Sequence, residues 1–174
     1  MTFSTLDQLE AGSRVFIDAS IFIYHFTGSS LKCRRFLESC ESGRFAGLTS
    51  VTAVAEVAHR LMMVEAVTKG LVSPGNVVRK LREKPSLIRE LHVYQEQIEL
   101  IPLMGIAVRD LNLEVMAFAA EIRRRHGLLV NDSLLSATAI REGIVDFASA
   151  DSDFERVQEL RLFGPDDLAS VFSH

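Results

Sequence analysis

Short β-prone apolar runs alternate with longer stretches of helical periodicity along this 174-residue chain. The first run, Val15–Ile17, ends at an acidic residue and precedes a helical pattern over residues 19–24. Further strands are expected at Phe45–Thr49, Ile98–Leu103, Asp146–Ala148 and Leu160–Phe163. Strands that are separated by helices pair in parallel, because each crossover returns the chain to the same end of the sheet. The predicted fold class is therefore α/β with a parallel sheet.

The helical stretches begin and end at residues that favour helix termini. We expect helices over residues 31–42, from 50 onward, and over 74–84, 85–94, 109–125 and 132–142. Pro74 and Pro85 suit the first turn of a helix, and Gly127 suits the position just after one. Helical spacing within 109–125 predicts a core-facing stripe, which consists of Leu113, Met116, Ala117 and Ala120.

Composition and charge exclude several classes of protein. Hydrophobic residues make up 48% and charged residues 24%, a balance typical of globular domains and not of disordered chains. The 19 basic and 23 acidic residues give a net charge of −4, so a strongly basic nucleic-acid binder is not indicated. The sequence contains no stretch suited to crossing a membrane and no pattern of a secretion signal at its start. We expect one cytoplasmic domain over residues 1–174.

Four acidic residues lie close to the ends of predicted strands or at the start of a helix. Asp18 and Asp151 follow strands, Glu56 lies in the second turn of a helix that follows a strand, and Asp132 opens a helix. Each position has an ordinary explanation. The three aspartates suit helix N-caps, and Glu56 can pair with a basic residue one turn further on, Arg60 or His59.

The same four residues also suggest a shared site. Ligands of parallel α/β sheets bind beyond the carboxyl ends of the strands, where Asp18, Glu56 and Asp151 are expected to approach one another. Carboxylates that are gathered in a cleft repel each other and are costly without a cation. Their oxygens suit Mg²⁺ or Mn²⁺, and an ion held in this way typically serves phosphoryl chemistry.

Four segments, in order, resemble the motifs of PIN-domain ribonucleases. They are Phe16–Tyr24, Thr49–Val57, His126–Ala139 and Ala148–Val157, and the resemblance extends from Val15 to about Pro165. It implies a three-layer α/β/α sandwich with a short central parallel sheet, a Mg²⁺ or Mn²⁺ site, and endoribonuclease activity on single-stranded RNA. Small bacterial members are commonly VapC-type toxins paired with a small antitoxin, and the resemblance also implies a homodimer.

Carried over residue by residue, the resemblance assigns roles to individual side chains. The catalytic and metal-binding positions are Asp18, Glu56, Asp132 and Asp151, with Asp153 as a further metal ligand. Ser20 and Ser149 would orient the carboxylates or bound water. The chain is longer than typical toxins of this kind, and the excess is expected to form a helical insert at about residues 67–98.

Two basic stretches are candidates for RNA contact. Arg123, Arg124 and Arg125 lie just before Asp132, so they either stabilise a helix end or grip phosphate near the site. The stretch from Arg79 to Arg89 is more typical of a solvated helix face, and if it binds RNA, its affinity should fall steeply with salt.

Two other functions stay open at this point. One is a catalytically silent PIN-fold interaction module, although all four acidic positions are filled. The other is a Mg²⁺ phosphatase acting on small esters, which would need a second aspartate where Ser20 stands.

Overall fold

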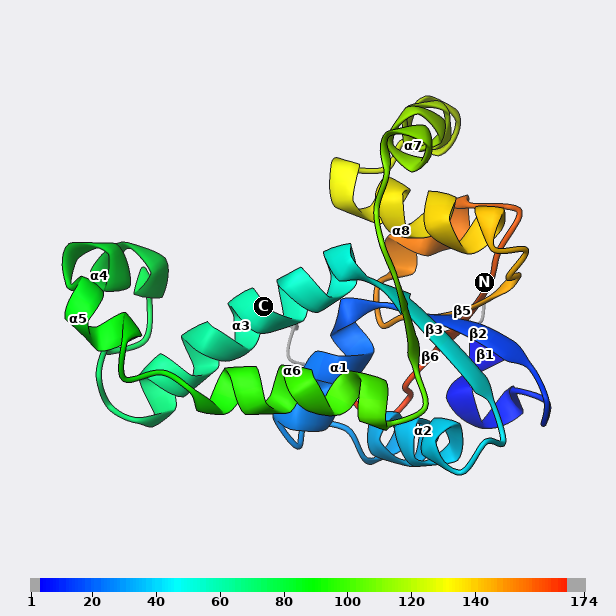
Figure 1. Ribbon diagram of the computed structural model, residues 1–174. Coiled ribbons are helices and arrows are strands. Elements are labelled where there is room, and N and C mark those ends of the chain that lie inside the picture. The colour runs from blue at the N-terminus through cyan, green and yellow to red at the C-terminus, as the bar shows by residue number, and fades with distance from the viewer. Residues whose placement is uncertain (1–3, 169–174) are drawn as a thin grey trace.

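The computed structural model describes residues 4–168 and confirms the α/β class (Figure 1). Six strands of this described chain form one parallel sheet in the order β1-β6-β5-β2-β3-β4. The strands are β1 (Ser4–Thr5), β2 (Arg14–Ile17), β3 (Ala46–Ser50), β4 (Ala107–Arg109), β5 (Asp146–Ala148) and β6 (Arg161–Gly164). The central strand β2 pairs with β3 on one side and β5 on the other, so the ends of these three strands lie side by side.

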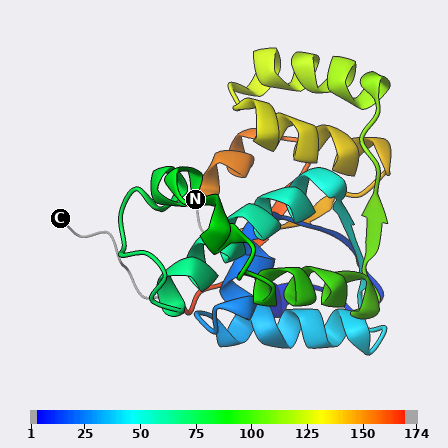
Figure 2. The ribbon, with the colours of Figure 1, turned by 60° about the vertical axis from the view of Figure 1, so that its left-hand side comes forward.

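Helices on both faces of the sheet make three layers (Figures 1 and 2). One outer layer contains α7 (Leu113–His126) and α8 (Val130–Arg141), and the other contains α1 (Ala19–Phe26), α2 (Leu31–Glu41) and α6 (Val93–Leu103). The core between the layers includes Phe16 and Phe147, whose rings stack with centroids 5.2 Å apart. Within residues 4–168, no helix combines the length and hydropathy needed to cross a membrane.

The long helix α3 (Val51–Thr68) extends out of this sandwich (Figure 1). Its far end carries α4 (Val77–Glu83) and α5 (Pro85–Ile88). A small apolar cluster, separate from the main core, supports these two helices and consists of Ala66, Val72, Leu81 and Leu91. The two remaining elements are the 3₁₀ turns η1 (Leu6–Gln8) and η2 (Ser152–Arg156). The view that residues 67–98 are an insert stays a prediction.

The strand expected at residues 98–103 is wrong, because these residues belong to α6. The fourth strand is β4, which begins four residues after α6 ends. Tyr94, Ile98 and Ile101 recur at helical spacing and pack against the core, which satisfies their apolar character without a strand. The helix expected over 85–94 is likewise two helices, α5 and the start of α6.

The core-facing stripe expected on α7 is also wrong. Val115, Ala119 and Ile122 are buried, whereas Leu113 is 83% exposed and Met116 is 42% exposed. Both faces of this helix carry apolar residues, and the face with the β-branched side chains packs on α8. Consequently α7 presents an apolar stripe to solvent on the outermost layer (Figure 1).

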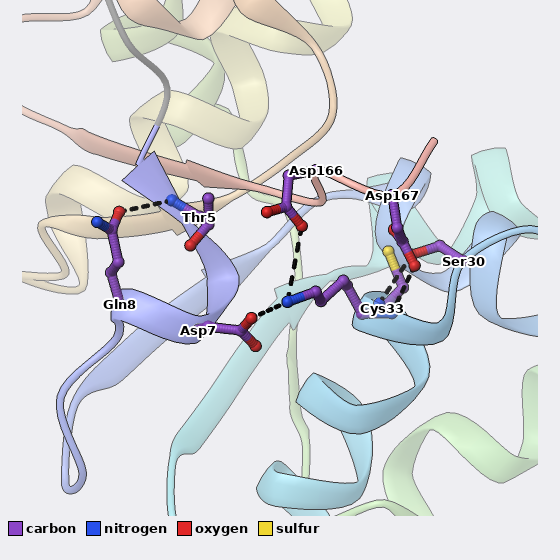
Figure 3. Close-up of polar contacts among 8 residues, drawn as sticks. Thr5, Asp7, Gln8, Ser30, Cys33, Asp166 and Asp167 are labelled. Atoms are coloured by element: carbon purple, nitrogen blue, oxygen red, sulfur yellow. Dashed lines mark hydrogen bonds and ion pairs between the residues drawn. The ribbon is translucent and has the colours of Figure 1, made fainter. Parts of the chain in front are cut away.

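The end of the described chain is attached to the start of α2 through Asp167 (Figure 3). Asp167 Oδ1 accepts a hydrogen bond from Ser30 Oγ at 2.6 Å, and its Oδ2 accepts one from the backbone amide of Lys32 at 2.9 Å. Burial opposes the ionisation of Asp167, but these hydrogen bonds hold its pKa below the usual value. The side chain of Lys32 pairs with two further carboxylates, those of Asp7 and Asp166. The first and last described segments are therefore joined at one helix N-terminus.

A buried carboxylate, that of Glu65, fixes the start of α6 on α3. Its Oε1 accepts a hydrogen bond from the His92 amide at 3.1 Å, and its Oε2 accepts one from the Tyr94 amide at 2.9 Å. Lys69 Nζ lies 2.6 Å from Oε1. Burial would raise the pKa of Glu65, but the hydrogen bonds from Lys69 and the two amides lower it to about 2. One side chain thus satisfies amides that the first turn of α6 leaves without a partner.

Replacing Glu65 by alanine should lower thermal stability markedly. Two amides would lose their acceptor, so we expect a loss of about 2–3 kcal/mol at pH 7 and a Tm lower by about 5–10 °C. The folded pKa of Glu65 is about 2 and its ordinary value is 4.5. Its contribution is therefore complete above pH 4.5, and the difference between variant and wild type should shrink as the pH falls toward 2.

Thermal unfolding followed by circular dichroism at pH 7 and pH 3 measures this effect. The matched control is Glu38→Ala on α2, which removes an exposed ion pair with Arg34 and should shift Tm by less than about 2 °C. Equal shifts for the two variants would contradict the role of Glu65.

Candidate metal centre

The four acidic residues singled out in the sequence come together in the structure. Asp18 follows β2, Asp151 follows β5, Glu56 lies in the second turn of α3, and Asp132 lies in the first turn of α8. Their side chains line one cavity of about 280 Å³. The other residues that line it are Ser20, Ile23, Tyr24, Arg60 and Phe154. The cavity lies beyond the carboxyl ends of the central strands, where parallel sheets bind ligands.

Asp18 is the most firmly held of the four. It is 6% exposed and caps α1, since its Oδ2 accepts a hydrogen bond from the Ser20 amide at 3.3 Å. The same oxygen accepts hydrogen bonds from the hydroxyls of Ser20 and Ser149, each at 2.6 Å. Burial raises the pKa of Asp18, and these hydrogen bonds only partly offset that effect. The ordinary explanation as a helix cap is thus correct, and the hydrogen bonds from Ser20 and Ser149 all reach Oδ2, so Oδ1 takes part in none of them.

The two serines also connect Asp18 to the loop after β5. Ser20 Oγ accepts a hydrogen bond from the Ala150 amide at 3.0 Å, and Ser149 Oγ accepts one from the Asp151 amide at 3.0 Å. Each hydroxyl therefore receives a backbone hydrogen bond and donates its own proton to Asp18. This arrangement sets the orientation of the Asp18 carboxylate and the position of the Asp151 backbone relative to it.

Glu56 has a partner that the sequence analysis did not identify. Asn131 donates a hydrogen bond from Nδ2 to Glu56 Oε2. The expected ion pair with Arg60 or His59 does not form among the described residues, although the charge of Arg60 still lowers the pKa of Glu56. Burial, followed by the charges of Asp18 and Asp132, raises that pKa overall. Only the position of Asn131 next to Asp132 could have indicated its role.

Three carboxylates form the tightest acidic group. Asp132, Asp151 and Asp153 each place an oxygen so that the three lie within 4.8 Å of one another. Burial raises the pKa of Asp132 to about 6, with further contributions from Asp151, Asp18 and Asp153. Arg156, which donates a hydrogen bond to Asp153 Oδ1 at 2.7 Å, opposes this shift. The group therefore carries unbalanced negative charge.

The capping explanation holds for Asp18 and Asp151 but not for Asp132. Asp151 caps η2, because its Oδ1 accepts a hydrogen bond from the Asp153 amide at 2.9 Å. Asp132 does not cap α8, because that helix begins at Val130 and has Leu129 at its N-cap. The Asp132 carboxylate accepts no hydrogen bond within residues 4–168, so capping does not account for its place in the cavity.

The three arginines at the end of α7 are in different environments. Arg123 donates a hydrogen bond to Ser133 Oγ at 3.0 Å, and Arg125 pairs with Glu159. Arg124 is exposed and lies beside Glu121 on a shallow surface. The expected RNA contacts of these side chains stay a prediction.

The donor set of the cavity fits a hard divalent cation. All the acidic ligands offer oxygen, several of these oxygens have no competing hydrogen bond, and the pKa values of Asp18, Glu56 and Asp132 are all raised. A cation bound among them would relieve both the repulsion and the loss of solvation that raise these values. The acidic group could therefore hold a divalent ion.

Asp132→Asn should stabilise the metal-free protein at neutral pH. The folded pKa of Asp132 is raised from 3.8 to about 6. Below pH 3.8 the side chain is protonated in both the folded and the unfolded state and costs no stability, whereas the folded protein loses stability as the pH rises through 6 and the buried side chain ionises. Removing the charge should raise stability by about 1 kcal/mol at pH 7.5, after allowance for partial solvent screening, and by much less at pH 4.

Thermal unfolding in EDTA-treated buffer measures this difference. Glu114→Gln, which removes a carboxylate from the first turn of α7, is the control and should give no gain. Millimolar Mg²⁺ or Mn²⁺ should stabilise the wild type more than Asp132→Asn by mass action. A wild type that is as stable as the variant at pH 7.5 would argue against repulsion in the cavity.

Comparison with known proteins places the chain in a family. Residues 15–160 match the PIN domain. Ribonuclease VapC2 of Methanocaldococcus jannaschii is 26% identical over 150 residues, which are 86% of this chain and 93% of that protein. The fold resembles VapBC2 of Rickettsia felis bound to a promoter DNA fragment, with TM-score 0.57, 17% identity, and coverage of 88% of this chain and 99% of that chain. It also resembles VapC20 of Mycobacterium tuberculosis, a sarcin–ricin loop cleaving toxin, with TM-score 0.56, 16% identity, and coverage of 84% and 98%. Since the family match covers most of its length, this chain belongs to the PIN domain family.

Proposed function

We propose that this protein is a Mg²⁺- or Mn²⁺-dependent endoribonuclease that hydrolyses phosphodiester bonds in RNA. The observation that carries this proposal is the convergence of four carboxylates on one cavity. They come from the residue after β2, from α3, from α8 and from the loop after β5. The relatives named ribonucleases support RNA as the substrate. A silent interaction module would gain nothing from this group of carboxylates, because burying them near one another costs stability.

The proposed roles follow from the contacts of each side chain. Asp18, Glu56, Asp132 and Asp151 would hold the ion, directly or through water, with Asp153 as a further ligand. When bound, a divalent ion supplies Lewis-acid polarisation of the phosphate and an activated water. Ser20 and Ser149 hold Asp18 Oδ2, which leaves Oδ1 for the ion.

Glu56 would contribute its free oxygen to the ion or to a water molecule bound there. Its Oε2 is held by Asn131, whereas its Oε1 accepts no hydrogen bond in the described chain. A bound ion would relieve the repulsion and the desolvation that raise the pKa of Glu56, so this side chain would be ionised in the loaded site.

The biological role that the relatives suggest is that of a toxin in a toxin–antitoxin pair. Solved structures of the same fold include a VapBC complex and a toxin–antitoxin complex from Klebsiella pneumoniae. We infer a small antitoxin protein as partner and, because RNA is the substrate, action in the cytoplasm.

A homodimer is part of the same proposal, and the exposed stripe on α7 supports it. Leu113, Met116 and Ala117 lie exposed on one face of this outermost helix, and Ala120 continues that face. Small residues near the middle of the helix allow close approach of a second helix. In an antiparallel pair, Glu114 in the first turn of α7 would lie near the basic last turn of its partner.

Asp18→Asn should reduce RNA cleavage by at least about 100-fold while the fold is kept, because it removes the charge of the most firmly positioned ligand. The measurement is cleavage of a panel of single-stranded RNAs in Mg²⁺ and in Mn²⁺, with circular dichroism to verify folding. The control is Asp110→Asn, which neutralises an exposed aspartate on the loop before α7 and should cleave like the wild type. Normal cleavage by Asp18→Asn would refute the nuclease assignment.

Ala120→Arg should convert the dimer to a monomer, because it places a charge in the middle of the α7 stripe. Sedimentation velocity of the wild type should give about twice the monomer mass, and the variant about 19 kDa. Leu103→Arg, at a 73% exposed apolar position on α6, should remain dimeric. A wild-type monomer at micromolar concentration would rule out this interface.

A further inference from the structure

We propose that α4 and α5, with the loop that joins them to α6, form a basic arm that grips the phosphate backbone of RNA at a distance from the acidic cavity. This basic arm is defined as residues 76–90. The proposal rests on RNA being the substrate, and it concerns a part of the chain to which the nuclease assignment gives no role.

The first observation is a local excess of positive charge. The whole chain has a net charge of −4, yet residues 76–90 contain five basic residues, Arg79, Lys80, Arg82, Lys84 and Arg89, and only two acidic ones, Glu83 and Glu90. Residues 76–90 therefore carry a net charge of +3, obtained as five minus two. The remainder of the protein is correspondingly acidic, so the basic arm is the natural place for a polyanion to bind.

The second observation is that several of these cations are unoccupied. Arg79 pairs with Glu83 at 3.2 Å, and Lys80 is held by the Ser73 hydroxyl at 2.7 Å. In contrast, Arg82, Lys84 and Arg89 are exposed, and their side chains form no ion pair or hydrogen bond within residues 4–168. Most other lysine and arginine side chains of the described chain are held by carboxylates or carbonyl oxygens. Three free cations within eight residues are therefore a distinctive feature of the basic arm.

The third observation is the rigid support of the arm. Leu81 and Leu91 are buried in the small apolar cluster on the far end of α3, and Glu65 fixes the beginning of α6 next to it. The arm and the α7–α8 pair stand at opposite ends of α3 (Figures 1 and 2). The basic arm is therefore held at a set distance from the cavity and does not belong to its lining.

The fourth observation is the path between the two places. Glu56 of the cavity and Thr68 at the end of α3 are twelve residues apart, which is about 18 Å along a helix. Arg60, which lines the cavity and has no ion-pair partner in the described chain, lies one turn along this path. At about 3.4 Å per stacked nucleotide, a strand that starts in the cavity needs roughly six nucleotides to run along α3 to the end that carries the basic arm. Short substrates would not reach it.

Arginine and lysine side chains that bind phosphate contribute affinity without sequence selectivity. The arm offers no large apolar surface, and its most exposed apolar side chain, Ile88, is 37% exposed. This chemistry favours a nucleic-acid backbone over an acidic protein segment, which would normally need apolar anchors in addition to charge. The basic arm therefore selects for substrate length, while the cavity carries out the chemistry.

The test uses Arg82→Gln/Arg89→Gln in the full chain and compares it with Arg35→Gln/Arg44→Gln. The control pair neutralises two exposed arginines outside the arm that form no ion pair with the described residues. Both pairs are made in the Asp18→Asn background, without divalent ions, so that binding is measured without cleavage. The probe is a 20-nucleotide oligouridine, titrated at several salt concentrations, and thermal unfolding verifies that each variant folds.

We expect the arm variant to bind the 20-nucleotide probe on the order of tenfold more weakly than the control at low salt. The slope of log affinity against log salt should fall by about 1 to 1.5, since each phosphate contact on a single strand contributes about 0.7. In proteins that keep Asp18, the arm variant should also cleave this probe less efficiently, while cleavage of a four-nucleotide oligouridine stays at the wild-type level.

Unchanged affinity and salt slope, or an equal loss in the control pair, would overturn the role of the basic arm and would favour a solvated surface or an acidic protein partner. Such a result leaves the nuclease proposal intact if the wild type cleaves RNA. If the wild type cleaves no RNA, the nuclease proposal fails, and the binding data still decide whether the arm holds a polyanion.

Discussion

Repulsion among carboxylates at the carboxyl edge of the sheet is the constraint on which the rest of the site depends. Asp18, Glu56 and Asp132 are brought together by strands and helices that are themselves stabilised by an apolar core, so they cannot separate. Burial raises the pKa of each of the three carboxyl groups, and the charges of neighbouring carboxylates raise it further for Glu56 and Asp132. A divalent cation bound among these carboxylates would relieve both effects, which is the physical basis of the proposed metal site.

Hydrogen-bond donors around the cavity determine which oxygens remain available. Ser20 and Ser149 occupy one oxygen of Asp18, Asn131 occupies one oxygen of Glu56, and Arg156 occupies one oxygen of Asp153. The opposite oxygen of Glu56 and both oxygens of Asp132 accept no hydrogen bond from the described residues, and Asp18 Oδ1 takes no part in the hydrogen bonds from Ser20 and Ser149. These hydrogen-bond donors thus hold the carboxylates of Asp18, Glu56 and Asp153 in fixed orientations, despite the repulsion among the negative charges.

The sequence was sufficient to predict those features that depend on local order along the chain. Strand–helix alternation predicted a parallel sheet, and the position of Asp18 and Asp151 after strands predicted their meeting at one edge. Ile98–Leu103 was predicted as a strand because its apolar residues are dense, but the contact of Glu65 with the amides of residues 92 and 94 starts a helix there. Which face of α7 is buried could not be predicted, since both faces are apolar and packing on α8 decides between them.

The contact of Asn131 with Glu56 was likewise beyond sequence reasoning, because it joins α8 to α3, which are far apart in the chain. It becomes visible only when the distance between the two side chains is known. The basic arm is an intermediate case, since its charge is apparent in the sequence but its separation from the cavity is a property of the fold.

The most direct test of the central claim is a crystal structure of the wild type with Mn²⁺, with diffraction data recorded where manganese scatters anomalously. The account predicts an anomalous peak in the cavity, about 2 Å from carboxylate oxygens of at least two of the residues Asp18, Glu56, Asp132 and Asp151. An empty cavity at millimolar Mn²⁺, or a peak only at other acidic residues, would contradict it.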